Sequence, residues 1–183
     1  MSLRQIRHSD ARRWRRIRAN NAEWLRQWEA TQPRTGQPPL SFHSMVSALR
    51  REGRAGRVLP FVVTFDGDLV GQLTVGGIQY GSLRGAHCGY WIAEEYAGRG
   101  IIPTAVALAT DHAFEVLRLH RMEIAMRPEN EPSRRVAEKL GFQFEGERKK
   151  FLHIDGDWRD HLVYVLNDGD IPEGVLTRWK ATH

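Results

Sequence analysis

The sequence has little of what marks a secreted, membrane-bound or metal-dependent protein. It has one cysteine in 183 residues, which excludes an internal disulfide and suits a reducing compartment. It has no long apolar run and no signal peptide. No histidine pair has zinc-protease spacing, and no Ser-His-Asp order can be read. We therefore expect a soluble, cytoplasmic protein without a metal, in which Cys88 is a small buried thiol rather than a reactive one.

The excess of positive charge is small. Lysine and arginine number 27 against 22 aspartates and glutamates, for a formal net charge of +5. This balance favours an anionic partner, such as a nucleotide cofactor or a ribonucleoprotein surface, but does not indicate specific nucleic-acid binding. One predicted helix carries five arginines: Arg12, Arg13, Arg15, Arg16 and Arg18. A solvated helix face is the preferred interpretation, and a patch that steers an anionic partner is the alternative.

The most informative stretch is a turn with two glycines, Gly98-Arg99-Gly100. A β-rich run ends before it, near Ala93, and an apolar segment with helical periodicity begins after it, at Ile101. Glycines let the backbone take φ > 0 and approach a ligand closely. The first amides of a helix are unpaired donors in a positive dipole field. Strand, turn and helix together predict a phosphate cradle made of main chain, with an ordinary strand-to-helix turn as the alternative.

The residues after the turn exclude two common phosphate sites. A Walker loop needs Lys and then Ser or Thr, but Ile101 and Ile102 follow the second glycine. A dinucleotide-binding turn needs Gly or Ala where this chain has Pro103. A pyrophosphate site that needs neither a lysine nor a metal remains.

A second helix start lies at Asn130. Asn130 is a good N-cap, Pro132 suits the first helical turn, and Gly141 ends the helix. Helix capping explains Asn130 but does not require a hydroxyl at Ser133.

The order of elements predicts one domain over residues 1–183, α/β (α+β) in class, with a mixed and mostly antiparallel sheet flanked by helices. Asp-Gly pairs at Asp66 and Asp155 predict two tight hairpins. The core is expected over about 3–166; a lid-like loop is expected over 31–39, and the tail 167–183 is left unplaced. The expected strands are 3–8, 58–65, 69–78, 86–93, 121–127, 142–154 and 158–166, and the expected helices are 11–29, 41–51, 101–117 and 130–140.

The glycine turn, the segment Asn130 to Ser133 and the run Ile154 to Asp160 resemble the GNAT N-acetyltransferases. The last match is close to the RimJ/RimL group of protein N-terminal acetyltransferases, nearest to its RimJ-type members that act on ribosomal-protein alanine. The resemblance covers about residues 3–166. It implies the GNAT fold, in which the strand ending at Ala93 and the strand starting at Arg121 splay apart.

The resemblance also implies acetyl-CoA as cofactor, with CoA as product. The pantetheine arm would pair with a free strand edge formed by Tyr90, Trp91, Ile92 and Ala93. The pyrophosphate would bind the amides of Gly98, Arg99, Gly100 and Ile101. Family members use the residues matching Asn130 and Ser133 to bind the arm and to protonate the departing thiolate, which makes Ser133 the expected catalytic residue. Relatives carry Gln or Arg where this chain has Glu95, so that side chain is expected to point away.

The acceptor site is expected at Trp24, Trp28, Glu29 and His153, with core packing as the alternative for the two tryptophans. RimL-like relatives have a glutamate base where this chain has Leu152. An α-amine, with a pKa of about 7.7–8.0, is neutral roughly one time in ten near pH 7, whereas a lysine is neutral less than about one time in a thousand. The missing carboxylate therefore favours an α-amine deprotonated through water, with His153 or Glu29 assisting.

The predicted function is acetyl-CoA-dependent acetylation of a protein N-terminal α-amine, with a ribosomal protein as candidate acceptor. The amine would attack the thioester directly, without an acyl-enzyme. One alternative keeps the fold and changes the acceptor to a small amine, such as an antibiotic or a metabolite, or the donor to another acyl-CoA. Another is a CoA-binding ribosome-assembly factor. The expected partner is a protein or peptide N-terminus, without membrane or specific nucleic acid, and the chain is expected to be a monomer or homodimer.

Overall fold

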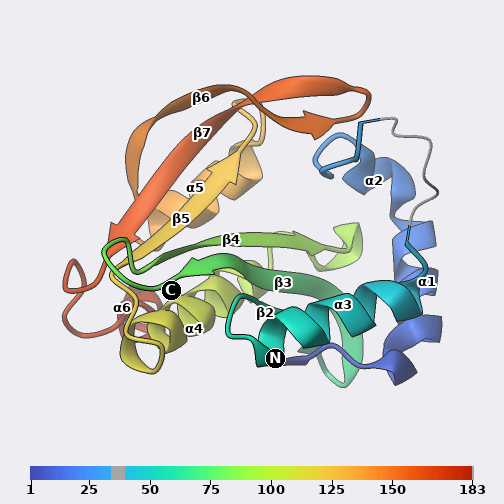
Figure 1. The fold of residues 1–183 in the computed structure, drawn as a ribbon, viewed down its shortest axis with the longest axis horizontal. Coiled ribbons are helices and arrows are strands. Elements are labelled where there is room, and N and C mark those ends of the chain that lie inside the picture. Colours follow the sequence, from blue (N-terminus) through green and yellow to red (C-terminus); the bar gives the residue numbers. More distant parts are fainter. Residues whose placement is uncertain (34–39, 183) are drawn as a thin grey trace.

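The computed structural model describes residues 1–33 and 40–182 and contains one seven-stranded sheet in the order β1-β2-β3-β4-β5-β7-β6 (Figure 1). The β4–β5 pair is parallel and every other neighbouring pair is antiparallel. The predicted mixed, mostly antiparallel sheet is therefore confirmed. The strands are β1 (Ser2–Gln5), β2 (Leu59–Phe65), β3 (Asp68–Gln79), β4 (Gly85–Ile92), β5 (Arg121–Met126), β6 (Gln143–Ile154) and β7 (Asp157–Asn167).

Both predicted Asp-Gly turns are present. Asp66 and Gly67 have φ of 49° and 87°, and Asp155 and Gly156 have φ of 47° and 85°. Positive φ at both central residues is the geometry that matches the twist of two paired strands, and aspartate and glycine adopt it at low cost. These two local signals fix the β2–β3 and β6–β7 hairpins.

The middle of the sheet splays apart. β4 pairs with β5 only through Gly85, Ala86 and His87. Beyond His87, β4 continues along β3 as far as Ile92, while β5 continues along β7 (Figure 1). An unpaired strand edge leaves N–H and C=O groups free to bind another extended chain. The predicted divergence of the two central strands is confirmed, and it creates such an edge on β4.

Helices cover both faces of the sheet, and none of those described has the length and apolar character to cross a membrane. Successive strand residues point to opposite faces, so Val62 packs with α1 and α3 while Val63 belongs to the cluster that contains α4 and α6. The helices are α1 (Ala11–Asn20), α2 (Ala22–Arg26), α3 (Phe42–Arg54), α4 (Ile101–Glu115), α5 (Glu131–Lys139) and α6 (Val175–Thr182), with short 3₁₀ turns η1 (His8–Asp10) and η2 (Glu94–Tyr96).

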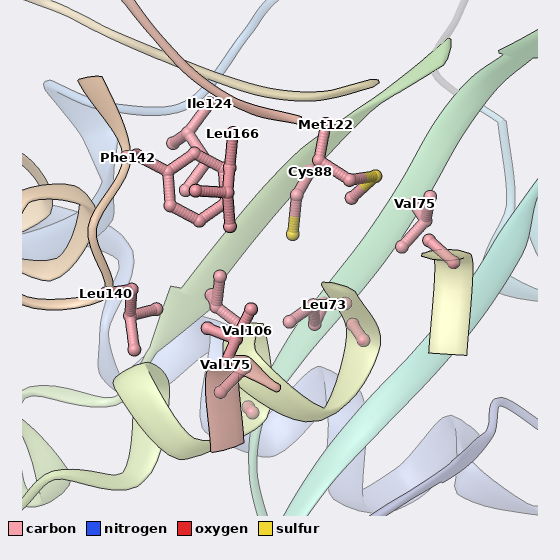
Figure 2. Close-up of a cluster of buried hydrophobic side chains, with 14 of the residues drawn as sticks. Leu73, Val75, Cys88, Val106, Met122, Ile124, Leu140, Phe142, Leu166 and Val175 are labelled. Atoms are coloured by element: carbon pink, nitrogen blue, oxygen red, sulfur yellow. The ribbon is translucent and has the colours of Figure 1, made fainter. Parts of the chain in front are cut away.

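The main hydrophobic core lies between the sheet and helix α4. Figure 2 shows Leu73 and Cys88 from the sheet facing Val106 of α4. On α4, alanines 105, 109 and 113 are buried at a spacing of four, which lets the helix lie close to the strands. Cys88 is buried in this core, and burial raises the pKa of its thiol to about 12. The expected burial of this small thiol is confirmed.

The first helical segment differs from the prediction of one helix over 11–29. The backbone breaks at Asn21, with φ of −115° and ψ of 18°. The Asn21 Nδ2 group donates to the Ile17 carbonyl at 2.9 Å, and its Oδ1 accepts from the Glu94 amide at 2.8 Å. Asparagine commonly competes in this way with helical backbone bonds. The break ties the N-terminal helices to the turn after β4.

The segment 167–183, which the sequence left unplaced, contains helix α6. The Asp111 carboxylate of α4 accepts from the amides of Val175 and Leu176 at 2.7 and 3.0 Å, which satisfies two free donors at the start of α6. Val175 and Trp179 are buried in the main core, so the core extends beyond the expected limit at Leu166. The lid predicted over 31–39 falls largely on residues 34–39, outside the described residues.

Candidate active site

A cavity of about 1350 Å³ lies where β4 and β5 diverge. Its walls come from both of these strands, the turn after η2, the start of α5, the segment containing α2, and the β6–β7 hairpin. The end of the hairpin lies near the segment that follows α2 (Figure 1), and a bridge between Ala30 and Ile154 joins the two. Small-molecule sites usually measure about 300–1,000 Å³, so this cavity has room for a cofactor and part of a second substrate.

The predicted glycine turn lines one end of the cavity. Gly98 and Gly100 both have φ of 73°, and Gly100 is the N-cap of α4 without any side-chain cap. Along α4, the first described amide that donates to a carbonyl four residues earlier is that of Thr104, which donates to the Gly100 carbonyl at 3.2 Å. Within the described part of the chain, the amides of Gly98, Arg99 and Gly100 have no acceptor. Free donors at a helix N-terminus favour an anion.

The charged side chains of the turn leave these amides accessible. The Arg99 guanidinium packs against the rings of Phe65 and Tyr96, 5.4 and 5.5 Å from their centroids. Glu95 is exposed and does not line the cavity, as expected. The hydrogen-bond donors that the turn offers are therefore main-chain amides.

A pair of hydroxyl groups lies in the wall between β4 and α5. Asn130 caps α5 by accepting the Ser133 amide at 3.1 Å, as predicted. The Ser133 hydroxyl lies 2.7 Å from the Tyr90 hydroxyl. Burial raises the pKa of Tyr90, so its phenol stays protonated and can donate to Ser133. The sequence predicted only a main-chain role for Tyr90, because nothing in it placed this strand residue beside the start of α5.

The other end of the cavity has an aromatic and charged wall. Trp24, Trp28 and Glu29, which the sequence placed at the acceptor site, all line it. The Trp24 indole N–H donates to the Ile92 carbonyl at 3.1 Å, so one group of the expected free edge of β4 is already occupied. The Glu29 carboxylate forms an ion pair with Arg18. Its negative charge is therefore neutralised locally.

Two predicted contact residues do not line the cavity. Ala93 is fully buried, and its amide donates to the Val70 carbonyl at 2.9 Å. His153 turns away: its Nδ1 lies 2.8 Å from the Thr31 hydroxyl and its ring packs edge-on against Trp158. The structure therefore gives Ala93 and His153 structural contacts in place of the ligand contacts expected of them.

A buried histidine that the sequence did not predict also lines the cavity. His161 on β7 is only 2% exposed, and its Nδ1 lies 3.0 Å from the Arg159 carbonyl. The alternation of a strand puts Arg159, His161 and Val163 on one face, but only the pairing of β7 with β5 brings that face to the cavity.

Comparison with known proteins decides the family. Residues 1–143 match the model of the acetyltransferase (GNAT) domain. The chain belongs to the GNAT acetyltransferase family. The structure of RimJ from Mycobacterium smegmatis, solved in complex with CoA-disulfide, is 42% identical and superimposes with a TM-score of 0.92 over 98% of this chain and 88% of that one.

Two curated relatives extend this GNAT assignment. The [ribosomal protein uS5]-alanine N-acetyltransferase of Escherichia coli is 27% identical over 175 residues, which span 94% of this chain and 90% of that protein. The probable N-acetyltransferase YjcK of Bacillus subtilis is 42% identical over 106 residues, which span 57% of this chain and 59% of that protein.

These matches confirm the predicted family, fold and cofactor. The chain is a GNAT N-acetyltransferase that uses acetyl-CoA, and it is close to the RimJ/RimL enzymes. The free amides at Gly98 and Gly100, the unpaired edge of β4 and the size of the cavity fit this cofactor.

Proposed function

We propose that this GNAT enzyme acetylates the N-terminal α-amine of a protein, with a ribosomal protein as the candidate acceptor. The observation that supports it most is that the glycine turn and the aromatic wall of Trp24 and Trp28 border the same cavity. A cofactor held at one end would present its thioester to an acceptor entering at the other. The name of the uS5-alanine N-acetyltransferase points to the same class of acceptor.

The choice of an α-amine over a lysine follows from the cavity wall. Leu152 lines the cavity at the position where RimL-like relatives have a glutamate base, and Glu29 is paired with Arg18. A lysine, with a pKa of about 10.4, needs a strong base near pH 7, whereas an α-amine near 7.7–8.0 needs only a weak one. A ribosomal acceptor would place the reaction in the cytoplasm.

The proposed contacts to the cofactor come from main-chain groups and from one hydroxyl group, that of Ser133. The amides of residues 98–101 would bind the pyrophosphate, and the edge of β4 from Tyr90 to Ile92 would pair with the pantetheine arm. Asn130 stands at the start of α5 in the same wall. Acetyl-CoA supplies an activated acyl group, and this chain positions it against the acceptor.

Ser133 is the proposed proton donor to the sulfur that leaves. The amine nitrogen would form a bond to the carbonyl carbon, and the carbon–sulfur bond would break with its electron pair on sulfur. The Ser133 hydroxyl is polarised by the Tyr90 hydroxyl at 2.7 Å, which makes it a better donor. The route needs no covalent acyl-enzyme.

A competition experiment tests the acceptor. The enzyme is incubated with acetyl-CoA and an equimolar mixture of short peptides with free N-terminal alanine or serine, an N-terminally blocked peptide with one lysine, spermidine and an aminoglycoside, and mass spectrometry follows each product. The proposal expects acetylation of the free peptide N-termini first. Faster acetylation of the small amines or of the blocked peptide would contradict it.

The alternative of a ribosome-assembly factor is separated by a cellular experiment. Ser133→Ala should abolish the cellular role if transfer is required. A variant that loses transfer but keeps that role would favour a factor that works by binding.

A further inference from the structure

His161 occupies an unusual position for a histidine, because it is buried and yet lines the cavity. It lies on β7, next to Leu162, whose register partner is Met126 at the end of β5. Only 2% of the residue is exposed, and it lines the cavity. Its face of the sheet also carries Arg127, whose guanidinium packs over the Trp28 ring at 5.6 Å. This is the acceptor end of the cavity.

The hydrogen bond of the ring fixes its tautomer. The Nδ1 atom lies 3.0 Å from the Arg159 carbonyl oxygen. A carbonyl oxygen can only accept, so Nδ1 must carry the proton and Nε2 of the neutral ring must carry the lone pair. The Phe151 ring packs edge-on against the imidazole, with centroids 5.6 Å apart, and holds its orientation.

The lone pair at Nε2 is available to a ligand. Nε2 makes no hydrogen bond with any described residue. The described side-chain atoms that are both fully buried and unbonded do not include Nε2, so this atom is accessible. Because the residue is otherwise buried and lines the cavity, the accessible part of the ring faces cavity space.

The surroundings keep this ring neutral. Burial is the largest effect and lowers the pKa of His161. The bond to the Arg159 carbonyl raises it by less, Arg127 lowers it, and Asp160 and Glu129 raise it, so that the pKa is lowered overall. From β6, its register partner Arg148 packs on Phe151, and its charge is paired with Glu123. A neutral imidazole at pH 7 can accept a proton.

The other candidate bases are occupied or turned away. His153 bonds to Thr31 outside the cavity, and Glu29 is paired with Arg18. We propose that His161 is the general base, and that its Nε2 accepts the proton of the attacking amine directly or through one water molecule. This proposal rests on the proposed function, since it assumes an amine acceptor.

The step balances without any further reactant. The nitrogen lone pair forms the new carbon–nitrogen bond, the carbon–sulfur bond breaks with its electrons on sulfur, and the excess proton on nitrogen passes to Nε2 and then to solvent. The sulfur receives the proton of the Ser133 hydroxyl, and Ser133 then regains a proton from solvent. A base of modest strength suffices because an α-amine has a pKa of only about 7.7–8.0.

The first test uses the wild-type protein and needs no acceptor. Long-range ¹H–¹⁵N spectra of the histidine rings distinguish the two neutral tautomers and the imidazolium, with His161→Gln used to assign the signal. We expect His161 to be neutral at pH 7 with its proton on Nδ1. A proton on Nε2, or a charged ring at pH 7, would overturn the proposal. Because CoA and acceptor are absent, failure of the proposed function leaves this result unaffected.

The second test is kinetic and uses His161→Gln with His153→Gln as the matched control. A general base contributes about 10²–10⁴-fold, so kcat/KM should fall by about that factor in His161→Gln and stay near wild type in His153→Gln. The pH profile adds a measure that a purely structural role would not change. As pH falls, wild-type kcat/KM should decline through two ionisations, first of the α-amine at about pH 7.7–8.0 and then of His161 at a lower pH, because burial lowers the pKa of that ring, whereas His161→Gln should show only the first.

Rescue by added imidazole tests the role of the ring even if a His161 variant is destabilised. His161→Ala leaves a ring-sized space, and imidazole should restore part of its activity. Near-wild-type kcat/KM in folded His161→Gln, or a two-ionisation profile in that variant, would overturn the assignment. If the wild type acetylates only small amines, the proposed function fails, and the same profiles measured with those amines still decide the role of His161.

Discussion

Replacing Gly100 by valine tests whether main-chain geometry binds the cofactor. Gly100 has φ of 73°, and an added Cβ would lie 3.6 Å from Trp179 Cζ2, an ordinary contact. The substitution therefore acts through the backbone. A left-handed conformation costs an L-residue roughly 1–2 kcal/mol, and a β-branched residue is at the unfavourable end. At about 2–4 °C per kcal/mol for a chain of this size, the melting temperature should fall by about 2–8 °C.

The effect on CoA should be larger than the effect on folding. Relief of the strain rotates the peptide units beside Gly100 and turns the free amides away from the anion. Hydrogen bonds to charged groups contribute about 1.5–3 kcal/mol each, so losing two of them costs about 3–6 kcal/mol. At about 1.4 kcal/mol per tenfold change, the dissociation constant for CoA should rise by roughly 10²–10⁴-fold. Titration calorimetry measures it.

Gly169→Val is the matched control. Gly169 has φ of 94°, has open space around its Cβ position and does not line the cavity. The same backbone penalty should lower its melting temperature in the same range and leave CoA affinity unchanged. Equal CoA affinity of the two variants would refute the cradle, whether because neither loses binding or because both do.

Three further perturbations test other parts of the structure. Ser133→Ala keeps the main-chain amide that donates to Asn130, so kcat should fall by about 10²-fold while CoA affinity changes little. Steady-state kinetics measures the first and calorimetry the second. Equal losses of turnover and of CoA affinity would make Ser133 a binding residue. Trp179→Ala removes a buried side chain of α6 and should cost about 3–5 kcal/mol in urea unfolding; an unchanged midpoint would mean that α6 adds nothing to the core. For Asp10, burial raises the pKa, but the bonds from Arg4 and from the Arg7 amide, together with the charges of both arginines, lower it more in sum, so the folded pKa is depressed. The stability that Asp10 contributes is thus present above about pH 3.9 and is lost as pH falls through the folded pKa. The unfolding free energies of wild type and Asp10→Asn should therefore differ by about 1–3 kcal/mol at pH 7 and converge in acid. A difference that stays constant with pH would contradict this.

Features encoded by neighbouring residues could be predicted from the sequence. The Asp-Gly hairpins, the cap at Asn130 and the positive φ at Gly98 and Gly100 each depend on a few adjacent residues with special backbone preferences. The order of strands and helices then follows from periodicity, and the resemblance to the GNAT family supplied the splay between β4 and β5.

Features that depend on distant partners could not be predicted. The helix break at Asn21 is stabilised by the amide of Glu94, 73 residues further along the chain. Helix α6 begins on the carboxylate of Asp111, far back in α4. His161 reaches the cavity only through the register of β7 against β5, and the contact between Tyr90 and Ser133 needs the spacing of a strand and a helix. A single sequence carries no signal for such pairs.

A crystal structure with bound CoA is the measurement that tests the central claim most directly. The account predicts pyrophosphate oxygens within hydrogen-bonding distance of the amides of residues 98–101, the arm along β4, and the sulfur beside Ser133 with the space beyond it bordered by Trp28 and His161. A pyrophosphate held by side chains elsewhere on the molecule, with the glycine turn unoccupied, would contradict it.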